Sequence, residues 1–222
     1  MKHHDTPDEI RRRLLRTIAA VPVVVAVPRL LGLVGCDASG ASGATGTTGT
    51  AGGTTLDPTL ACADDDDVDP TLAETEGPYF TPNSPERTSL LESGIGGTVL
   101  VVSGLVLTRS CQPVAGALLD FWQADDAGQY DNAGYRLRGH QFTDARGAYR
   151  LETVVPGLYP GRTRHIHVKV QASSQSILTT QLYFPGESRN ASDGIFDASL
   201  LMQIAGAATG KAGQFNFVLD MA

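Results

Sequence analysis

TVLVVSGLVLT, which spans Thr98 to Thr108, is rich in β-branched and apolar residues and has the composition of a β-strand. No part of the chain sustains an apolar period of about 3.6 residues. Short strands broken by Gly, Pro, Asp and Asn predict an all-β protein, an antiparallel β-sandwich with long loops and little helix. Residues 185–212 are expected to be irregular, with one or two helical turns between Ala198 and Ile204. The other predicted strands are Ala117 to Trp122, Ala148 to Val155, His165 to Ala172, Leu178 to Phe184 and Phe215 to Leu219.

The charge balance of the chain is acidic. Its 222 residues carry a formal net charge of -7, and the residues after position 35 contain 11 basic and 21 acidic side chains. Such a chain lacks the basic surface that neutralises phosphates, so no nucleic-acid partner is expected. The length suits one domain with appendages, and nothing in the sequence specifies an oligomeric state.

The N-terminal 35 residues are predicted to be an export signal. IRRRLLR, from Ile10 to Arg16, resembles the twin-arginine signal, and an apolar run follows from Ile18 to Val27. LVGC, from Leu33 to Cys36, resembles a bacterial lipobox, in which Cys36 is lipidated. The expectation is an exported lipoprotein of the cell envelope that meets the membrane only through a lipid anchor. Two prolines and an arginine interrupt the apolar run, so a plain amphipathic leader or a single membrane anchor is the alternative.

Residues 36–73 are predicted to be a flexible linker, because Ala, Ser, Gly and Thr make up almost all of 37–56 and cannot bury a core. The folded domain is then expected to span 74–222. If Cys36 is lipidated, Cys62 and Cys111 are an even pair in an oxidising compartment, which predicts a disulfide between them. Two free buried thiols are the alternative.

HIHVKV, from His165, contains two histidines two residues apart in a strand-like run. Residues two apart on a strand point to the same face, so both imidazoles can reach one ion. Tyr130 and Tyr159 lie in neighbouring loops. Two imidazoles and two phenolates form a hard, anionic ligand set, which suits a trivalent metal and favours iron over zinc or copper. A surface position for the His-x-His pair is the alternative, and His140 is interpreted as structural.

Seven motifs in a fixed order extend this pattern over residues 74–219. Together they resemble the intradiol ring-cleavage dioxygenases, the family of the protocatechuate and catechol dioxygenases, and most closely its exported, single-domain members. The motifs are ETEGPYF (Glu74 to Phe80), DFWQAD (Asp120 to Asp125), GQYD (Gly128 to Asp131), TDARGAY (Thr143 to Tyr149), PGLY (Pro156 to Tyr159), RTRHIH (Arg162 to His167) and TQLYF (Thr180 to Phe184).

The resemblance implies a metal centre of four protein ligands. Tyr130, Tyr159, His165 and His167 match ligands of a non-haem Fe(III), and Tyr159 matches the tyrosinate that leaves the iron when substrate binds. Arg162 matches the arginine that stabilises negative charge on the bound ring.

The remaining matches concern the substrate pocket. Gln181 matches a polar residue of the pocket, and Gly77, Pro78 and Tyr79 match the segment that closes over the substrate. The implied reaction cleaves a small aromatic diol with O2 to a muconate-type diacid. Catechol, protocatechuate, hydroxyquinol and chlorinated catechols all remain open as substrates.

A function of another class is also compatible with part of the chain. TDARGAY and the later PGLY resemble the sandwich domains appended to peptidases and transporters, which would make the chain a non-catalytic binding or adhesion module of the cell envelope. Such a module has no reason to carry Tyr130, His165, His167 and Arg162 together. That set favours the enzyme.

Overall fold

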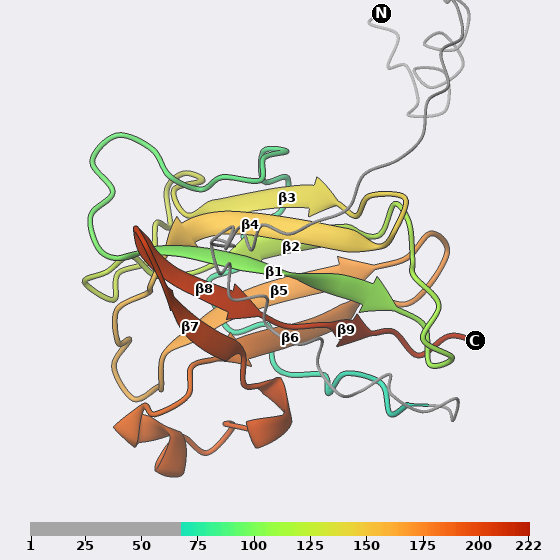
Figure 1. The fold of residues 1–222 in the computed structure, drawn as a ribbon. Coiled ribbons are helices and arrows are strands. Elements are labelled where there is room, and N and C mark those ends of the chain that lie inside the picture. Colours follow the sequence, from blue (N-terminus) through green and yellow to red (C-terminus); the bar gives the residue numbers. More distant parts are fainter. Residues whose placement is uncertain (1–67) are drawn as a thin grey trace, which may run out of the picture. The chain divides into compact units, whose positions relative to one another are not determined.

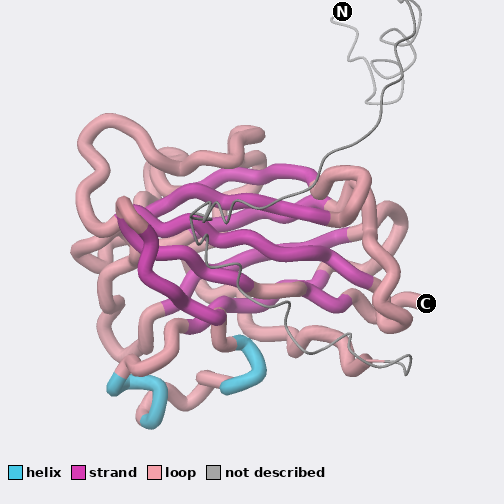
Figure 2. The backbone as a smooth tube through the Cα atoms, in the orientation of Figure 1, coloured by secondary structure: helices cyan, strands magenta, loops and turns pink. Residues whose placement is uncertain are grey.

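Strands dominate the structure of residues 68–222, the part of the chain that the computed structural model describes (Figure 1). Figure 2 shows that helix is confined to short turns, which are the 3-10 elements η2 (Ser188–Ala191) and η3 (Ala198–Leu200). The strands are β1 (Val99–Leu107), β2 (Leu118–Trp122), β3 (Arg138–Phe142), β4 (Ala148–Val154), β5 (His165–Gln171), β6 (Leu178–Tyr183), β7 (Gln203–Ala207), β8 (Gly210–Gln214) and β9 (Phe217–Val218).

These strands form two sheets. One sheet has the order β4-β1-β8-β7, with β9 also paired to β1, and the other has the order β3-β2-β5-β6. Alternate residues of each sheet fill the space between them. Leu100 and Val102 of β1 and Ile166, Val168 and Val170 of β5 are completely buried in this core. The predicted sandwich with little helix is therefore confirmed.

The six strands expected from the sequence are all present, with ends that differ by one or two residues. The structure adds three strands that were not predicted: β3, β7 and β8. Their sequences, RGHQF, QIAGA and GKAGQ, are poor in β-branched and aromatic residues, so backbone pairing with neighbours holds them rather than side-chain propensity.

Two expectations about the pairing and the C-terminal third were wrong. β1 pairs in parallel with both β8 and β9, so the sandwich is not purely antiparallel. The segment expected to be irregular up to residue 212 instead forms the antiparallel β7–β8 hairpin from Gln203 onward. The helical turn predicted between Ala198 and Ile204 is limited to η3.

The described chain begins with a segment that the sequence analysis placed in the linker. The Val68 N–H donates to the Arg109 carbonyl, and the Thr71 N–H donates to the Val218 carbonyl, so residues 68–71 lie along the sandwich. Cys111 is disulfide-bonded. Its predicted partner Cys62, the predicted lipidation site Cys36 and the predicted export signal lie outside the described residues, so these remain predictions.

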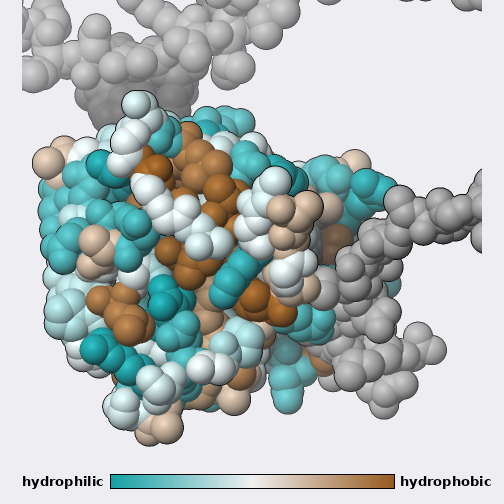
Figure 3. Space-filling model, turned by 60° about the vertical axis from the view of Figure 1, so that its left-hand side comes forward, coloured by the Kyte–Doolittle hydropathy of each residue, from teal (hydrophilic) through white to brown (hydrophobic). Residues whose placement is uncertain are grey.

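The surface of the described residues mixes apolar and polar side chains. Figure 3 shows one face on which apolar residues gather near the centre within a hydrophilic surround. In residues 68–222, no helix is long and apolar enough to cross a membrane. The large apolar side chains that are exposed are Leu72, Tyr135, Phe142, Leu158, Ile177 and Ile195.

Gly104 permits a close backbone crossing within the first sheet. A Cβ atom at this position would lie 1.7 Å from the carbonyl oxygen of Phe215. We predict that Gly104→Ala destabilises the fold by about 3 kcal/mol or prevents folding, because backbone cannot give way as a side chain can. Gly206→Ala is the matched control, since its Cβ would meet nothing within 4 Å. Urea unfolding of both variants measures their free energies of unfolding, and equal values would contradict the prediction.

Candidate metal centre

The period of β5 brings its two histidines to one face of the second sheet. Ile166 between them points into the core, whereas His165 and His167 point away from it toward the loops that cover the sheet. Both imidazoles are nevertheless buried, with 5% and 3% of their surface exposed. The backbone register sets Trp122 of β2 on one side of His167 and Gln181 of β6 on the other.

Three nitrogen and oxygen atoms converge at this face. The Nε2 atoms of His165 and His167 are 3.1 Å apart, and the hydroxyl of Tyr130 lies 3.2 Å from Nε2 of His165. Tyr130 comes from the loop that follows β2, and its ring centroid is 6.2 Å from that of His167. The structure therefore brings together three of the four predicted ligands in direct contact.

The fourth predicted ligand joins the group through another tyrosine. The hydroxyls of Tyr159 and Tyr79 are 2.7 Å apart. Tyr79 also stacks on Tyr130, with ring centroids 4.5 Å apart and planes inclined by 18°. The rings of Tyr130 and Tyr159 meet edge to face at 5.9 Å. Tyr79 therefore contacts both of the predicted tyrosinate ligands.

Both histidines are neutral at neutral pH. Burial lowers the pKa of His165 to about 4, and burial, His165 and the nearby arginines lower the pKa of His167 well below its ordinary value. The carbonyl of Thr163 accepts a hydrogen bond from Nδ1 of His165 at 2.7 Å, which directs the lone pair of Nε2 toward the site. Neutral imidazoles with free lone pairs are what a metal ion requires.

Two residues that were not predicted as functional hold this geometry. Trp122, interpreted from the sequence as core, is buried and stacks on His167 with centroids 4.8 Å apart and planes inclined by 7°. Arg138 is 99% buried, and its guanidinium donates to the carbonyls of Tyr79 and Asp131. It thus ties the segment beside Tyr79 to the residue that follows Tyr130.

The segment predicted to close over the substrate lies next to these residues. Gly77 has a φ of +68°, and a Cβ there would lie 3.5 Å from Cε1 of His167. Pro78 is exposed. Lys169 of β5 anchors both ends of the segment: its ammonium group pairs with Glu76 at 2.5 Å and lies 3.6 Å from the ring centroid of Phe80.

Arg162 and Gln181 are in contact beside the histidines. Nη2 of Arg162 donates to Oε1 of Gln181 at 2.8 Å, and Nε donates to Asp193 at the same distance. Gln181 is completely buried, although a glutamine on a strand is usually solvent-facing. Asp193 was not predicted. It lies in an irregular segment without a motif, so no sequence signal could have found it.

The side chains present fit a trivalent metal ion. Atoms that bind one ion at about 2.1 Å and at right angles to each other lie about 3 Å apart, and Nε2 of His165 has this spacing from both the Tyr130 hydroxyl and Nε2 of His167. Burial raises the pKa of Tyr130 well above its ordinary value, so its phenolate requires a nearby cation. Within residues 68–222, no group of three or more His, Cys, Asp and Glu side chains could hold a metal.

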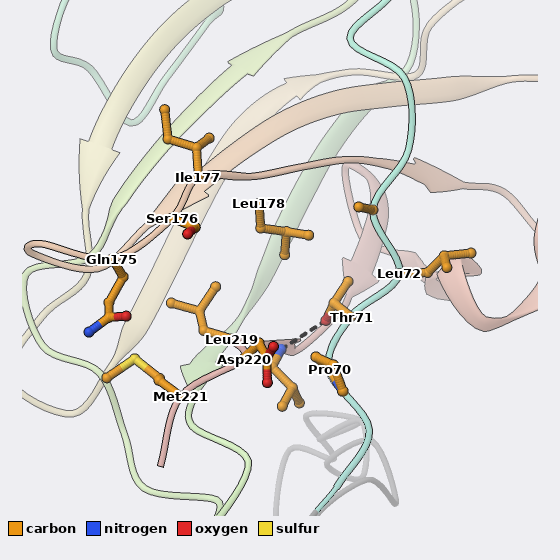
Figure 4. Close-up of a pocket in the computed structure, with 12 residues that line it drawn as sticks. Pro70, Thr71, Leu72, Gln175, Ser176, Ile177, Leu178, Leu219, Asp220 and Met221 are labelled. Carbon is orange, nitrogen blue, oxygen red and sulfur yellow. Dashed lines mark hydrogen bonds between the residues drawn. The ribbon is translucent and has the colours of Figure 1, made fainter.

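A separate cavity of about 400 Å³ lies elsewhere on the domain (Figure 4). It is formed by the first described residues, the turn before β6 and the C-terminal segment, where the Thr71 hydroxyl accepts a hydrogen bond from the Val218 N–H. Its lining is mostly apolar, with Leu178 and Leu219 facing each other across it. None of the predicted site residues lines this cavity.

Comparison with known proteins identifies the family. Residues 75–221 match a family model described as Dioxygenase. The solved dioxygenase domain of a dioxygenase carbohydrate-binding protein fusion from Streptomyces sp. SirexAA-E is 60% identical, covers 69% of this chain and 100% of that chain, and superposes with a TM-score of 0.68. This chain belongs to the intradiol ring-cleaving dioxygenase family.

More distant relatives include enzymes with different substrates in their names. The protocatechuate 3,4-dioxygenase beta chain of Burkholderia cepacia is 36% identical over 46% of this chain and 52% of the relative. The structure of 3-chlorocatechol 1,2-dioxygenase from Rhodococcus opacus 1CP is 27% identical, covers 73% of this chain and 76% of that chain, and has a TM-score of 0.64. The chain spans about half the length of the curated relatives it matches.

Proposed function

We propose that this chain binds non-haem Fe(III) and cleaves catechol-type aromatics with O2 to muconate-type diacids. The observation that carries the proposal is the convergence of the Tyr130 hydroxyl and Nε2 of His167 on Nε2 of His165, at 3.2 Å and 3.1 Å, with Tyr159 hydrogen-bonded to Tyr79 beside them. Membership of the intradiol family supports it.

A ferric ion bound here would act as a Lewis acid and as a template for the two oxygens of the diol. The chain contributes the environment. Buried, neutral imidazoles supply nitrogen donors without adding charge. A Tyr159 phenolate held by the ferric ion would accept a proton from a catechol hydroxyl, and the Tyr79 hydroxyl, 2.7 Å from that of Tyr159, would remain hydrogen-bonded to it.

A guanidinium lies beside the histidines, where negative charge would develop on a bound ring. It belongs to Arg162, whose Nη2 donates to Gln181 and to the Tyr183 hydroxyl. Its side chain is 19% exposed, so its field is only partly screened by water. A fixed cation in such a place stabilises charge that develops on the ring during the reaction.

The alternative of a non-catalytic sandwich module is less well supported. In such a module the two histidines of β5 would face solvent, or each would pack against the core without contacting the other. Here both are buried without being charged, and Nδ1 of His167 has no hydrogen-bond partner among the described residues. A buried polar cluster of this kind costs folding free energy, which a metal site would offset.

Substitution of a histidine ligand tests the metal centre. We predict that His165→Ala loses most of its bound iron, the visible tyrosinate-to-iron band and catechol cleavage, because one of four protein ligands is removed. His140→Ala is the matched control. It lies on the same sheet but contacts the Ser84 carbonyl rather than the cluster, so it should keep all three properties. Iron analysis, visible spectra and product identification make the measurement; full iron loading in a colourless wild-type protein would reject the tyrosinate ligands.

The tyrosine that the resemblance assigns as displaceable gives a second test. We predict that Tyr159→Phe keeps iron, shifts the visible band and slows turnover by about tenfold or more, because one phenolic oxygen is lost from the centre. Tyr135→Phe, which removes an exposed hydroxyl bonded to the Pro82 carbonyl, should leave spectrum and rate unchanged. Identical kinetics for wild type and Tyr159→Phe would show that Tyr159 takes no part.

We also propose that the protein is exported through the twin-arginine route and anchored by lipid at Cys36, with a Cys62–Cys111 disulfide. Support comes from the N-terminal sequence and from the disulfide-bonded state of Cys111. In a bacterium that has the twin-arginine pathway, a clickable fatty-acid label should enter the wild-type chain and the control Ser39→Ala but not Cys36→Ala. Label retained in Cys36→Ala would refute the anchor. Non-reducing peptide mapping tests the disulfide.

A further inference from the structure

Arg162 already has a carboxylate partner within the protein. Its Nε donates to Oδ2 of Asp193 at 2.8 Å, and Nη2 is committed to Gln181 and Tyr183. The Asp193 side chain is 3% exposed and that of Arg162 is 19% exposed. This is therefore a largely buried ion pair, in which each charge satisfies the other.

Asp193 is fixed by more than the arginine. The same Oδ2 accepts the backbone N–H of Thr163 at 2.8 Å, and Oδ1 accepts the N–H of Ile195 at 3.2 Å. Burial acts to raise the pKa of Asp193, but these hydrogen bonds and Arg162 outweigh it and hold the pKa below its ordinary value. Asp193 is therefore a carboxylate at neutral pH, held in one place.

A second carboxylate lies near the same guanidinium. Glu74 lies close enough to Arg162 for the charge of the guanidinium to act on its carboxyl group. Burial raises the pKa of Glu74 and the charge of Arg162 lowers it. Asp193 is therefore the carboxylate that pairs with Arg162, and Glu74 is a second acidic group within reach of its charge.

The other arginines near the cluster are engaged with backbone. All three guanidinium nitrogens of Arg138 donate to the carbonyls of Asp131 and Tyr79. Nη1 of Arg189 donates to the carbonyls of Tyr159 and Arg162.

From this arrangement we infer that Asp193 orients and neutralises Arg162, so that the site takes catechols without a ring carboxylate in preference to dihydroxybenzoates. The inference rests on the proposed function, since it concerns the substrate of the same site. Asp193 acts through Arg162 and is a positioning residue. An anionic ring substituent would meet like charge from Asp193 and would find Arg162 already neutralised, which raises KM and Kd rather than lowering the rate of the chemical step.

The wild-type protein tests the inference without any substitution. Catechol, 3,4-dihydroxybenzamide and 3,4-dihydroxybenzoate are compared; the last two are nearly equal in size and differ in charge. We expect the amide to bind at least about tenfold more tightly than the acid, because one contact between like charges commonly weakens binding by about that factor. Equal affinities, or tighter binding of the acid, would overturn the inference.

The readout separates this inference from the proposed function. Calorimetry under nitrogen measures binding of the three diols, and oxygen uptake measures cleavage. If none of the three diols is cleaved, the proposed function is refuted. The ratio of the Kd values for the acid and the amide would still decide whether the site rejects carboxylates.

A variant assigns the effect to Asp193. Asp193→Asn keeps an oxygen for the Thr163 N–H and removes the negative charge. The kcat/KM for 3,4-dihydroxybenzoate, divided by that for catechol, should therefore rise about tenfold in this variant, because KM for the acid falls. Asp197→Asn is the matched control, because Asp197 is a nearby carboxylate that bonds Ser199 and not Arg162. An unchanged ratio in folded Asp193→Asn would overturn the role of Asp193. If that variant does not fold, the comparison of amide and acid in the wild type decides.

Discussion

The alternation of β5 is the constraint on which the site depends. Every second residue of this strand must be apolar to fill the core, as Ile166, Val168 and Val170 do. The intervening positions are then forced to the other face, where His165 and His167 lie side by side. A shift of register by one residue would exchange the two sets, so the hydrophobic core itself fixes the position of the imidazoles.

The cover over this face comes from parts of the chain that are distant in sequence. Tyr79 arrives from the segment before β1, Tyr130 from the loop after β2, and Tyr159 from the loop after β4. Buried Arg138 holds two of these segments through their carbonyls. The result is a polar cluster excluded from water, in which neutral histidines and a paired arginine are stable and an unpaired charge is not.

The same exclusion of water links binding and selectivity. An arginine that was free could serve either the developing charge of the ring or a substituent on it. The ion pair with Asp193 restricts Arg162 to one orientation and cancels part of its field. Selectivity in this site therefore depends on a residue that belongs to none of the family motifs and that reaches the arginine from the loop between η2 and η3.

Strand periodicity and motif order were readable along the chain, because they are local properties. They sufficed for the sandwich, for the six strongest strands, and for the grouping of Tyr130, His165, His167, Arg162 and Gln181 in one site. β7 and β8 were not readable, since their Gly- and Ala-rich sequences form strands only when a neighbour supplies hydrogen bonds. The parallel pairing of β1, the placement of Tyr79 between two tyrosines and the contact of Asp193 with Arg162 depended on tertiary structure alone. Contacts between residues far apart in sequence leave no periodic trace, because the free energy that selects them comes from packing and from the burial of charge.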